Sequence, residues 1–258
     1  MKCLVINLDR SAGRLAQVTR QFARIGVPFQ RVAGVDAAGG SVTAAPPLTA
    51  PEAACFLSHR QCWQIIADGG DHHGAIFEDD VIFADNGGAL LADDGWIPRD
   101  ADVVKLETFF VPVRLRRRRV AVGDGYSLVR LVGRHVGAAG YILSRDAARK
   151  LLARTRRFKA AVDNVLFCPT MTTCSRNTIY QLMPALCAQA HLLPGDEIPV
   201  SLMQADHNVR KSLTDRIGAE ASRAFAHLRN GTLLGTDKVD AVPFRDSAMR
   251  LPRSAGAR

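Results

Sequence analysis

Long apolar stretches are missing from this sequence. A helix that spans a bilayer needs about 20 consecutive apolar residues, and no stretch of the 258 residues approaches that length. The opening apolar run stops at the polar segment 7–10, which leaves it too short for a secretion signal. We therefore expect a cytoplasmic protein without a transmembrane helix.

Closely spaced cysteine pairs are also missing. The six cysteines stand singly, without the short paired spacings of a zinc site or a dithiol redox motif. A chain of this length can stabilise itself by burying apolar side chains, so it does not need a disulfide framework. We expect reduced thiols at Cys3, Cys55, Cys62, Cys168, Cys174 and Cys187.

Aromatic residues are scarce at 6%, whereas basic residues are in excess and give a formal net charge of +9. Such a charge suits nucleic acid, an anionic lipid surface or a phosphorylated substrate. The basic residues concentrate at 114–119 and 201–258, where aromatic side chains are too few to stack on bases. Nucleic acid is therefore not expected as a partner. A Gly-x-x-x-x-Gly-Lys-Ser/Thr loop is absent too, which leaves a phosphotransferase without support.

The apolar residues that are present alternate between strand-like runs and helical spacing. Strands are expected at 3–8 and 29–35, on either side of a helix that Ser11 caps and Gly26 ends. Further strands are expected at 74–77, 102–106, 127–132, 140–143 and 178–183, and further helices at 52–67, 145–154 and 162–167. Strands interleaved with helices predict the α/β class, with a mostly parallel sheet flanked by helices.

The C-terminal part differs in character. Residues 214–230 place apolar side chains near one helical face and arginines away from it, which predicts a basic amphipathic helix. We therefore divide the chain into a domain at 1–200 and a basic helical extension at 201–258.

Three acids, Glu78, Asp79 and Asp80, directly follow the apolar strand at 74–77. Strand ends are where open α/β sheets place their ligands. Neighbouring carboxylates raise each other's pKa, and a hard cation such as Mg²⁺ or Mn²⁺ would offset their repulsion. The triplet could equally cap a loop or the next helix, so by itself it leaves both interpretations open.

Several blocks, in order along the chain, resemble glycosyltransferase family 25. They are 5–10 with Arg14, 26–29, 52–59 with Trp63, 77–81, 105–108, 135–144, 162–163 and 181–189. Together they cover roughly residues 3–190 and look closest to the bacterial lipooligosaccharide galactosyltransferases of the family. The arginine run and the segment after Gln189 depart from the family pattern, which leaves the acceptor undefined.

The resemblance implies an inverting transfer of a hexose, with galactose favoured, from a UDP-sugar to a glycan or lipid-linked glycan acceptor in surface polysaccharide biosynthesis. It also implies a GT-A-like nucleotide-binding fold and dependence on Mn²⁺ or Mg²⁺. The alternative is a protein that binds a sugar nucleotide or a glycan without turnover. The basic run and the basic helix could then contact the inner face of the membrane, although each also fits a solvated charged surface.

The family pattern also guides the choice of site residues. Those expected to bind the donor are Asn7, Asp9, Arg10, Arg14, Glu52, Ser58, His59, Glu78, Asp79, Lys105, Gly140 and Tyr141. Asp80 is expected as the first metal ligand and Asp79 as the second, and His207 could complete the site. Structural roles compete with several of these: Arg14 could be solvated, His59 could be a hydrogen-bonded structural histidine, and the glycine could allow tight strand packing.

An inverting transfer needs a base that takes the proton of the acceptor hydroxyl. Asp163 lies in a matched block and is the preferred base, Glu107 is the second candidate, and His135 is a weaker one. An N-cap is an equally ordinary role for Asp163.

Overall fold

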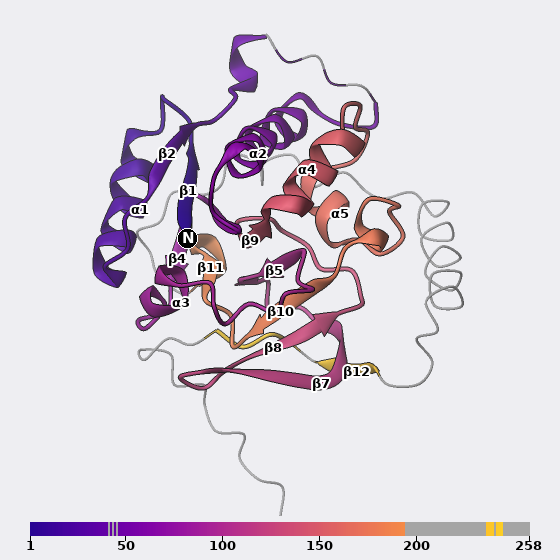
Figure 1. The fold of residues 1–258 in the computed structure, drawn as a ribbon. Helices are drawn as coiled ribbons and strands as arrows, with labels where there is room; N and C mark the ends of the chain where they lie inside the picture. The colour runs from indigo at the N-terminus through magenta and orange to yellow at the C-terminus, as the bar shows by residue number, and fades with distance from the viewer. Residues whose placement is uncertain (41, 43, 45, 194–235, 240, 245–258) are drawn as a thin grey trace, which may run out of the picture.

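The computed structural model describes residues 1–40, 42, 44, 46–193, 236–239 and 241–244 (Figure 1). The expected helix at 214–230 and His207 lie outside the described residues. The division at residue 200 stays a prediction, but one part of the C-terminal segment joins the main sheet: residues 236–239 pair with the strand that carries the arginine run.

A nine-stranded sheet runs through the molecule in the order β12-β7-β8-β10-β5-β9-β3-β1-β2. Its strands are β1 (Lys2–Asn7), β2 (Gln30–Ala33), β3 (His73–Glu78), β5 (Val103–Lys105), β7 (Val113–Gly123), β8 (Tyr126–Leu131), β9 (Gly140–Ser144), β10 (Ile179–Met183) and β12 (Thr236–Val239). A second sheet has the order β4-β11-β6, with β4 at Val81–Phe83, β11 at Cys187–Gln189 and β6 at Glu107–Thr108.

The large sheet is mixed, which corrects the predicted mostly parallel one. Only β1 with β2, β1 with β3, and β5 with β10 pair in parallel, and the other five pairings are antiparallel. One reason is that β7 and β8 form a hairpin, whose turn residues Asp124 and Gly125 both have the positive φ that tight hairpins require. The other is that β9 inserts antiparallel between β3 and β5.

The carboxyl ends of several strands nevertheless meet at one edge. β3 and β5 are each antiparallel to β9, so they run in the same direction as each other. β1 and β2 share that direction through their parallel pairing with β3. Asn7, Glu78 and Lys105, the last residues of β1, β3 and β5, therefore lie toward the same edge of the sheet.

Helices cover both faces of the sheet, as predicted. They are α1 (Ala12–Ile25), α2 (Ala50–Asp68), α3 (Gly88–Ala92), α4 (Arg145–Arg154) and α5 (Val162–Phe167), with short 3-10 turns at Ala37–Gly39, Cys174–Arg176 and Ala190–Leu192. Leu4 of β1 packs with α2, α4 and α5, whereas its neighbours Cys3 and Val5 pack with α1 and α3 on the other face. In the part of the chain that the structure describes, none of the helices has the length and apolarity to cross a bilayer.

Helix ends explain two of the sequence signals. Gly26 ends α1 with φ 67°, as predicted. Ser11 stands at the N-cap position, also as predicted, but its side chain makes no capping hydrogen bond. A capping box begins α2 instead, in which Thr49 and Glu52 bind each other's backbone amides. The Glu52 carboxylate therefore accepts the hydrogen bond of the Thr49 amide at the start of the helix.

Candidate active site

A cavity of about 420 Å³ lies beside the carboxyl ends of β1 and β3, between the loop after β2 and the first turns of α2. Polar side chains from four segments line it: Asn7, Arg10 and Arg14 between the end of β1 and the first turn of α1, Asp36 in the loop after β2, Ser58 and His59 on α2, and Glu78 and Asp79 at the end of β3. Seven of the predicted donor-binding residues are thus brought together around one cavity.

The acidic strand end is neutralised from α1. One Arg14 nitrogen lies 3.1 Å from Asp79 Oδ1 and the other 2.7 Å from Asp80 Oδ2, and its side chain is only 17% exposed. Asn7 Nδ2 donates to Asp79 Oδ2 over 2.7 Å. Gln189 Nε2 approaches Asp80 Oδ2 at 3.3 Å. Arg14 is therefore an ion-pair partner of both acids and not a solvated helix residue.

Burial shifts the pKa values of the two aspartates at this strand end. Loss of water contact, together with the nearby Glu78 carboxylate, raises the pKa of Asp80 to about 7. Burial also raises the pKa of Asp79, and Arg14 opposes that shift. Additional positive charge at this position would stabilise the ionised form of both carboxylates.

His59 is held by a chain of buried hydrogen bonds. Its Nε2 lies 3.3 Å from Glu78 Oε1, and its Nδ1 lies 2.9 Å from the Tyr141 hydroxyl. The same hydroxyl accepts a hydrogen bond of 2.8 Å from Trp63 Nε1. Tyr141 is fully buried behind His59 and does not line the cavity. It orients His59 in place of the predicted contact with the donor, and Trp63 is a core residue.

Other predicted donor residues have structural roles as well. A Cβ atom on Gly140 would lie 2.4 Å from Cys187 Sγ, so this glycine serves tight packing. Asp9 forms an ion pair with Arg31 at the surface, and Glu52 stays in its capping box, away from the cavity lining. Ser58 lines the cavity, but its hydroxyl already accepts from Val35 N at 2.8 Å.

A second polar cluster lies apart from the cavity. Lys105 and Glu107 are both completely buried, with Nζ 2.7 Å from Glu107 Oε1 and 2.7 Å from Gly137 O. The Lys105 ammonium also lies 4.2 Å from the centroid of the Phe167 ring. Burial raises the pKa of Glu107 to about 7, and the charge of Lys105 opposes this shift. Lys105 therefore binds a carboxylate of the protein and does not line the cavity.

The candidate bases gather around the backbone of Gly137. Asp163 accepts a hydrogen bond from Gly137 N at 3.3 Å and one from Asn164 N at 2.7 Å, in the first turn of α5. Neither Asp163 nor Glu107 lines the cavity. His135 is buried, and burial together with the charge of Lys105 lowers its pKa to about 2. An imidazole with such a pKa is a weak base, which removes His135 from the candidates.

His135 is expected to make the stability of the protein depend on pH. Its unfolded form takes up a proton below about pH 6.5, whereas its folded form does not until about pH 2. Stability is therefore lost as the pH falls below 6.5, by about 1.4 kcal/mol per pH unit from this group. Urea titrations between about pH 7 and 4.5 should show a shallower decline for His135→Gln than for the wild type. Parallel declines would contradict the assignment.

Besides Asp36, two side chains at the candidate site were not predicted. Arg31 on β2 donates from Nε to Asn7 Oδ1 at 3.0 Å and fixes that amide, and Cys55 lines the cavity one helical turn before His59. The parallel pairing of β1 with β2 could have suggested Arg31, because Arg31 stands beside Val5 in the register. Cys55 gave no signal because it has no neighbouring cysteine in the sequence.

Comparison with known proteins shows the family. The profile of glycosyltransferase family 25 (LPS biosynthesis protein) matches residues 1–166. The chain is 34% identical over 206 residues to the lacto-N-neotetraose biosynthesis glycosyltransferase LgtE of Neisseria gonorrhoeae, covering 72% of each chain. It is 34% identical over 205 residues to LgtB of Neisseria meningitidis, covering 72% of this chain and 74% of the relative.

One more distant relative agrees with these. The lipooligosaccharide biosynthesis protein lic2B of Haemophilus influenzae is 31% identical over 159 residues, which is 58% of each chain. A solved glycosyltransferase involved in the glycosylation of the major capsid of PBCV-1 aligns over 73% of this chain and 91% of its own, with 9% identity and a TM-score of 0.39, too low to add to the assignment. The residues matched by the family profile include those that line the cavity and those of the acidic strand end. From the profile match and the Neisseria relatives, the chain belongs to glycosyltransferase family 25.

Proposed function

We propose that this glycosyltransferase moves a hexose, with galactose favoured, from a UDP-sugar to a glycan or lipid-linked glycan acceptor in lipopolysaccharide or lipooligosaccharide biosynthesis. The observation that carries the proposal is the cavity at the carboxyl ends of β1 and β3, where Asn7 and Arg14 contact the acidic strand end and Arg10 lines the wall. Its volume of about 420 Å³ lies in the range of small-molecule sites. Its position fits the GT-A-like nucleotide-binding fold that the family implies.

The relatives support the class of acceptor. Their names place LgtE and LgtB in lacto-N-neotetraose biosynthesis and lic2B in lipooligosaccharide biosynthesis. A saccharide of the bacterial surface is therefore the acceptor that we propose for this chain. Galactose rests on the resemblance of the sequence blocks to the lipooligosaccharide galactosyltransferases of the family.

We include Mn²⁺ or Mg²⁺ in the proposal. Asp79 and Asp80 would hold the ion, because hard cations prefer carboxylate oxygens. The raised pKa of Asp80 supports this, since Arg14 brings one positive charge to two buried carboxylates beside a third. A bound ion would act as a Lewis acid toward the leaving diphosphate.

The chain's own residues would position the donor and take the proton. Arg10 and Arg14 line the cavity, where Arg10 pairs with Asp36 and Arg14 with Asp79 and Asp80. Their guanidinium groups would donate hydrogen bonds to a diphosphate. Inversion requires a base at the acceptor hydroxyl, and we propose Asp163. Its side chain is half-buried, and its contact with Gly137 N is long at 3.3 Å, whereas Glu107 is fully buried and ion-paired. The proton would move to a carboxylate oxygen of Asp163.

The test is UDP release from a panel of UDP-sugars, with and without Mn²⁺, in the presence of simple saccharides or lipid-linked glycans. One donor should turn over in a metal-dependent manner, and Asp80→Asn should lower the rate by about 100-fold or more, as loss of transition-state charge stabilisation does. The matched control is Asp94→Asn, because Asp94 pairs with His73 at the opposite end of β3. Binding of a donor without turnover of any acceptor would favour the alternative, a protein that binds sugar nucleotides.

A further inference from the structure

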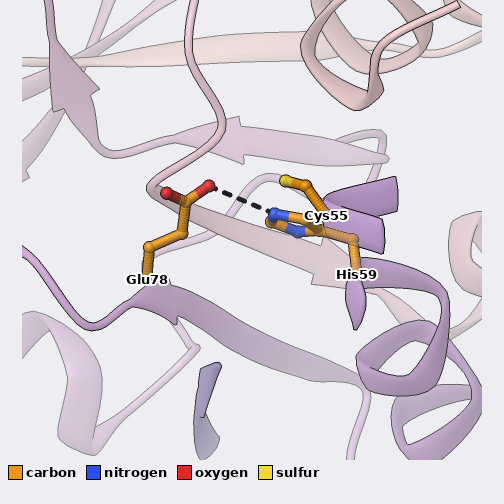
Figure 2. A group of neighbouring side chains, drawn as sticks. All are labelled: Cys55, His59 and Glu78. Carbon is orange, nitrogen blue, oxygen red and sulfur yellow. Dashed lines mark hydrogen bonds and ion pairs between the residues drawn. The ribbon is translucent and has the colours of Figure 1, made fainter. Parts of the chain in front are cut away.

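We propose that Cys55, His59 and Glu78 form a site for a thiophilic divalent ion, Zn²⁺, in the wall of the cavity. The three side chains are drawn together in Figure 2. The site is separate from Asp79 and Asp80, which carry only oxygen ligands and for which we propose Mn²⁺ or Mg²⁺.

The geometry brings three different ligand atoms toward one point. Cys55 and His59 are one turn apart on α2 and therefore lie on the same helix face, toward Glu78 at the end of β3 (Figure 2). The Sγ, imidazole and carboxylate atoms all lie within 4.8 Å of one another, and His59 Nε2 is 3.3 Å from Glu78 Oε1. Neighbouring ligands around tetrahedral zinc are about 3.3 to 3.8 Å apart. The separation of His59 and Glu78 already lies in that range, and binding would draw the Cys55 thiol into it.

The chemistry of the three ligands selects the metal. A thiolate and an imidazole with a single carboxylate favour Zn²⁺ over Mg²⁺ and Mn²⁺, which prefer oxygen. On binding, the Cys55 thiol would release its proton to solvent, and the ion would replace the hydrogen bond between His59 and Glu78. One thiolate and one carboxylate then offset the two charges of the ion, which a partly buried site requires.

A second observation supports the assignment, because the ring of His59 is held in place by a fixed partner at Nδ1. Its Nδ1 lies 2.9 Å from the Tyr141 hydroxyl, which Trp63 Nε1 holds from the other side at 2.8 Å. Metal-binding histidines usually donate their second ring N–H to such a fixed partner. Without a metal, Nε2–H donates to the Glu78 carboxylate, which only accepts, and Nδ1 accepts from the Tyr141 hydroxyl. On metal binding the imidazole would change tautomer, so that Nδ1–H donates to the hydroxyl and the lone pair of Nε2 faces the ion.

The site would also regulate the transferase. Cys55, His59 and Glu78 all line the cavity that we propose for the UDP-sugar, so a bound Zn²⁺ ion should compete with the donor. This consequence rests on the proposed function, whereas binding of the metal itself does not.

The experiment is a Co²⁺ titration of the full chain, because a thiolate ligand of Co²⁺ gives a strong charge-transfer absorption in the near ultraviolet. The band should saturate at one equivalent and should disappear when Zn²⁺ is added. Cys55→Ser should abolish it. Cys168→Ser should keep it, because Cys168 is a partly buried cysteine that contacts Thr170 and lies outside the cluster. Asp80→Asn should keep it as well.

Absence of the band, or its persistence in Cys55→Ser, would overturn the proposal. Because Cys55→Ser could fail to fold, its circular dichroism is compared with that of the wild type, and Glu78→Gln serves as the second variant, expected to weaken Co²⁺ binding at least tenfold. In a separate titration, Zn²⁺ should weaken UDP binding to the wild type at least tenfold and leave Cys55→Ser unaffected. If UDP does not bind at all, the donor site is wrong, while the Co²⁺ band still decides the metal site.

Discussion

Replacing Lys105 by Met is expected to lower the free energy of unfolding by about 3 to 5 kcal/mol, because it leaves the buried Glu107 carboxylate without its counter-charge. Lys105 Nζ donates to both Glu107 Oε1 and Gly137 O. Among the described residues the other oxygen, Glu107 Oε2, has no hydrogen-bond partner. The loss should shrink as the pH falls, since a protonated Glu107 needs no positive neighbour and burial already raises its pKa to about 7.

Urea denaturation measures this effect, with Lys150→Met as the control. Lys150 forms an ion pair with Asp102 at 3.4 Å, but its side chain is 49% exposed, so its loss should cost less than about 1 kcal/mol. The double variant Lys105→Met with Glu107→Gln should recover a large part of the lost stability, because no buried charge is then left alone. Equal losses in Lys105→Met and Lys150→Met would contradict the buried ion pair.

Replacing Arg14 by Met is expected to lower kcat/KM by about 100-fold, which corresponds to about 3 kcal/mol. Arg14 contacts Asp79 and Asp80 and also lines the cavity, so its loss removes a positive charge from the acids and from the proposed diphosphate site. Removing one partner of a buried charge pair typically costs 2 to 5 kcal/mol. Steady-state kinetics with the preferred UDP-sugar measures the change.

The matched control for this variant is Arg20→Met on the same helix. Arg20 is exposed and does not line the cavity, so it should keep nearly full activity. If Arg14→Met and Arg20→Met had similar kinetics, the guanidinium of Arg14 would serve only to balance charge, and the diphosphate would have to bind elsewhere. Thermal unfolding of both variants separates a loss of activity from a loss of folded protein.

Much of the fold could be predicted where a single local signal decides the structure. The strand before the acidic triplet and helices α1, α2, α4 and α5 follow from apolar spacing and terminal glycines. The antiparallel place of β9 could not be predicted, because β9 pairs with β3 and β5, which lie far from it in the sequence. The β7–β8 hairpin is local, but its first strand carries no clear signal. β7 was missed because the arginines at 116–119 hide its alternation.

The location of the candidate site could be predicted from the sequence, but the role of each residue could not. The cavity gathers Asn7, Arg14, His59, Glu78 and Asp79, all of which the family pattern singles out. The family pattern does not show which of the matched side chains line the cavity and which are buried behind it. Tyr141, for example, belongs to a matched block but lies behind the cavity wall, where it holds His59. Only the packing around such a residue shows whether it contacts a ligand or supports a neighbour that does.

The pairing of β12 with β7 has a consequence for how this protein behaves in solution. β7 is 11 residues long, and β12 pairs with its first four residues, 113–116. Without β12, β7 would present its whole backbone edge to other molecules. Uncovered edges of that length invite strand addition from a second copy. A chain shortened before residue 236 would depend on the repulsion between its arginines to resist association through this edge. Salt screens such repulsion, so light scattering from the shortened chain should increase with ionic strength.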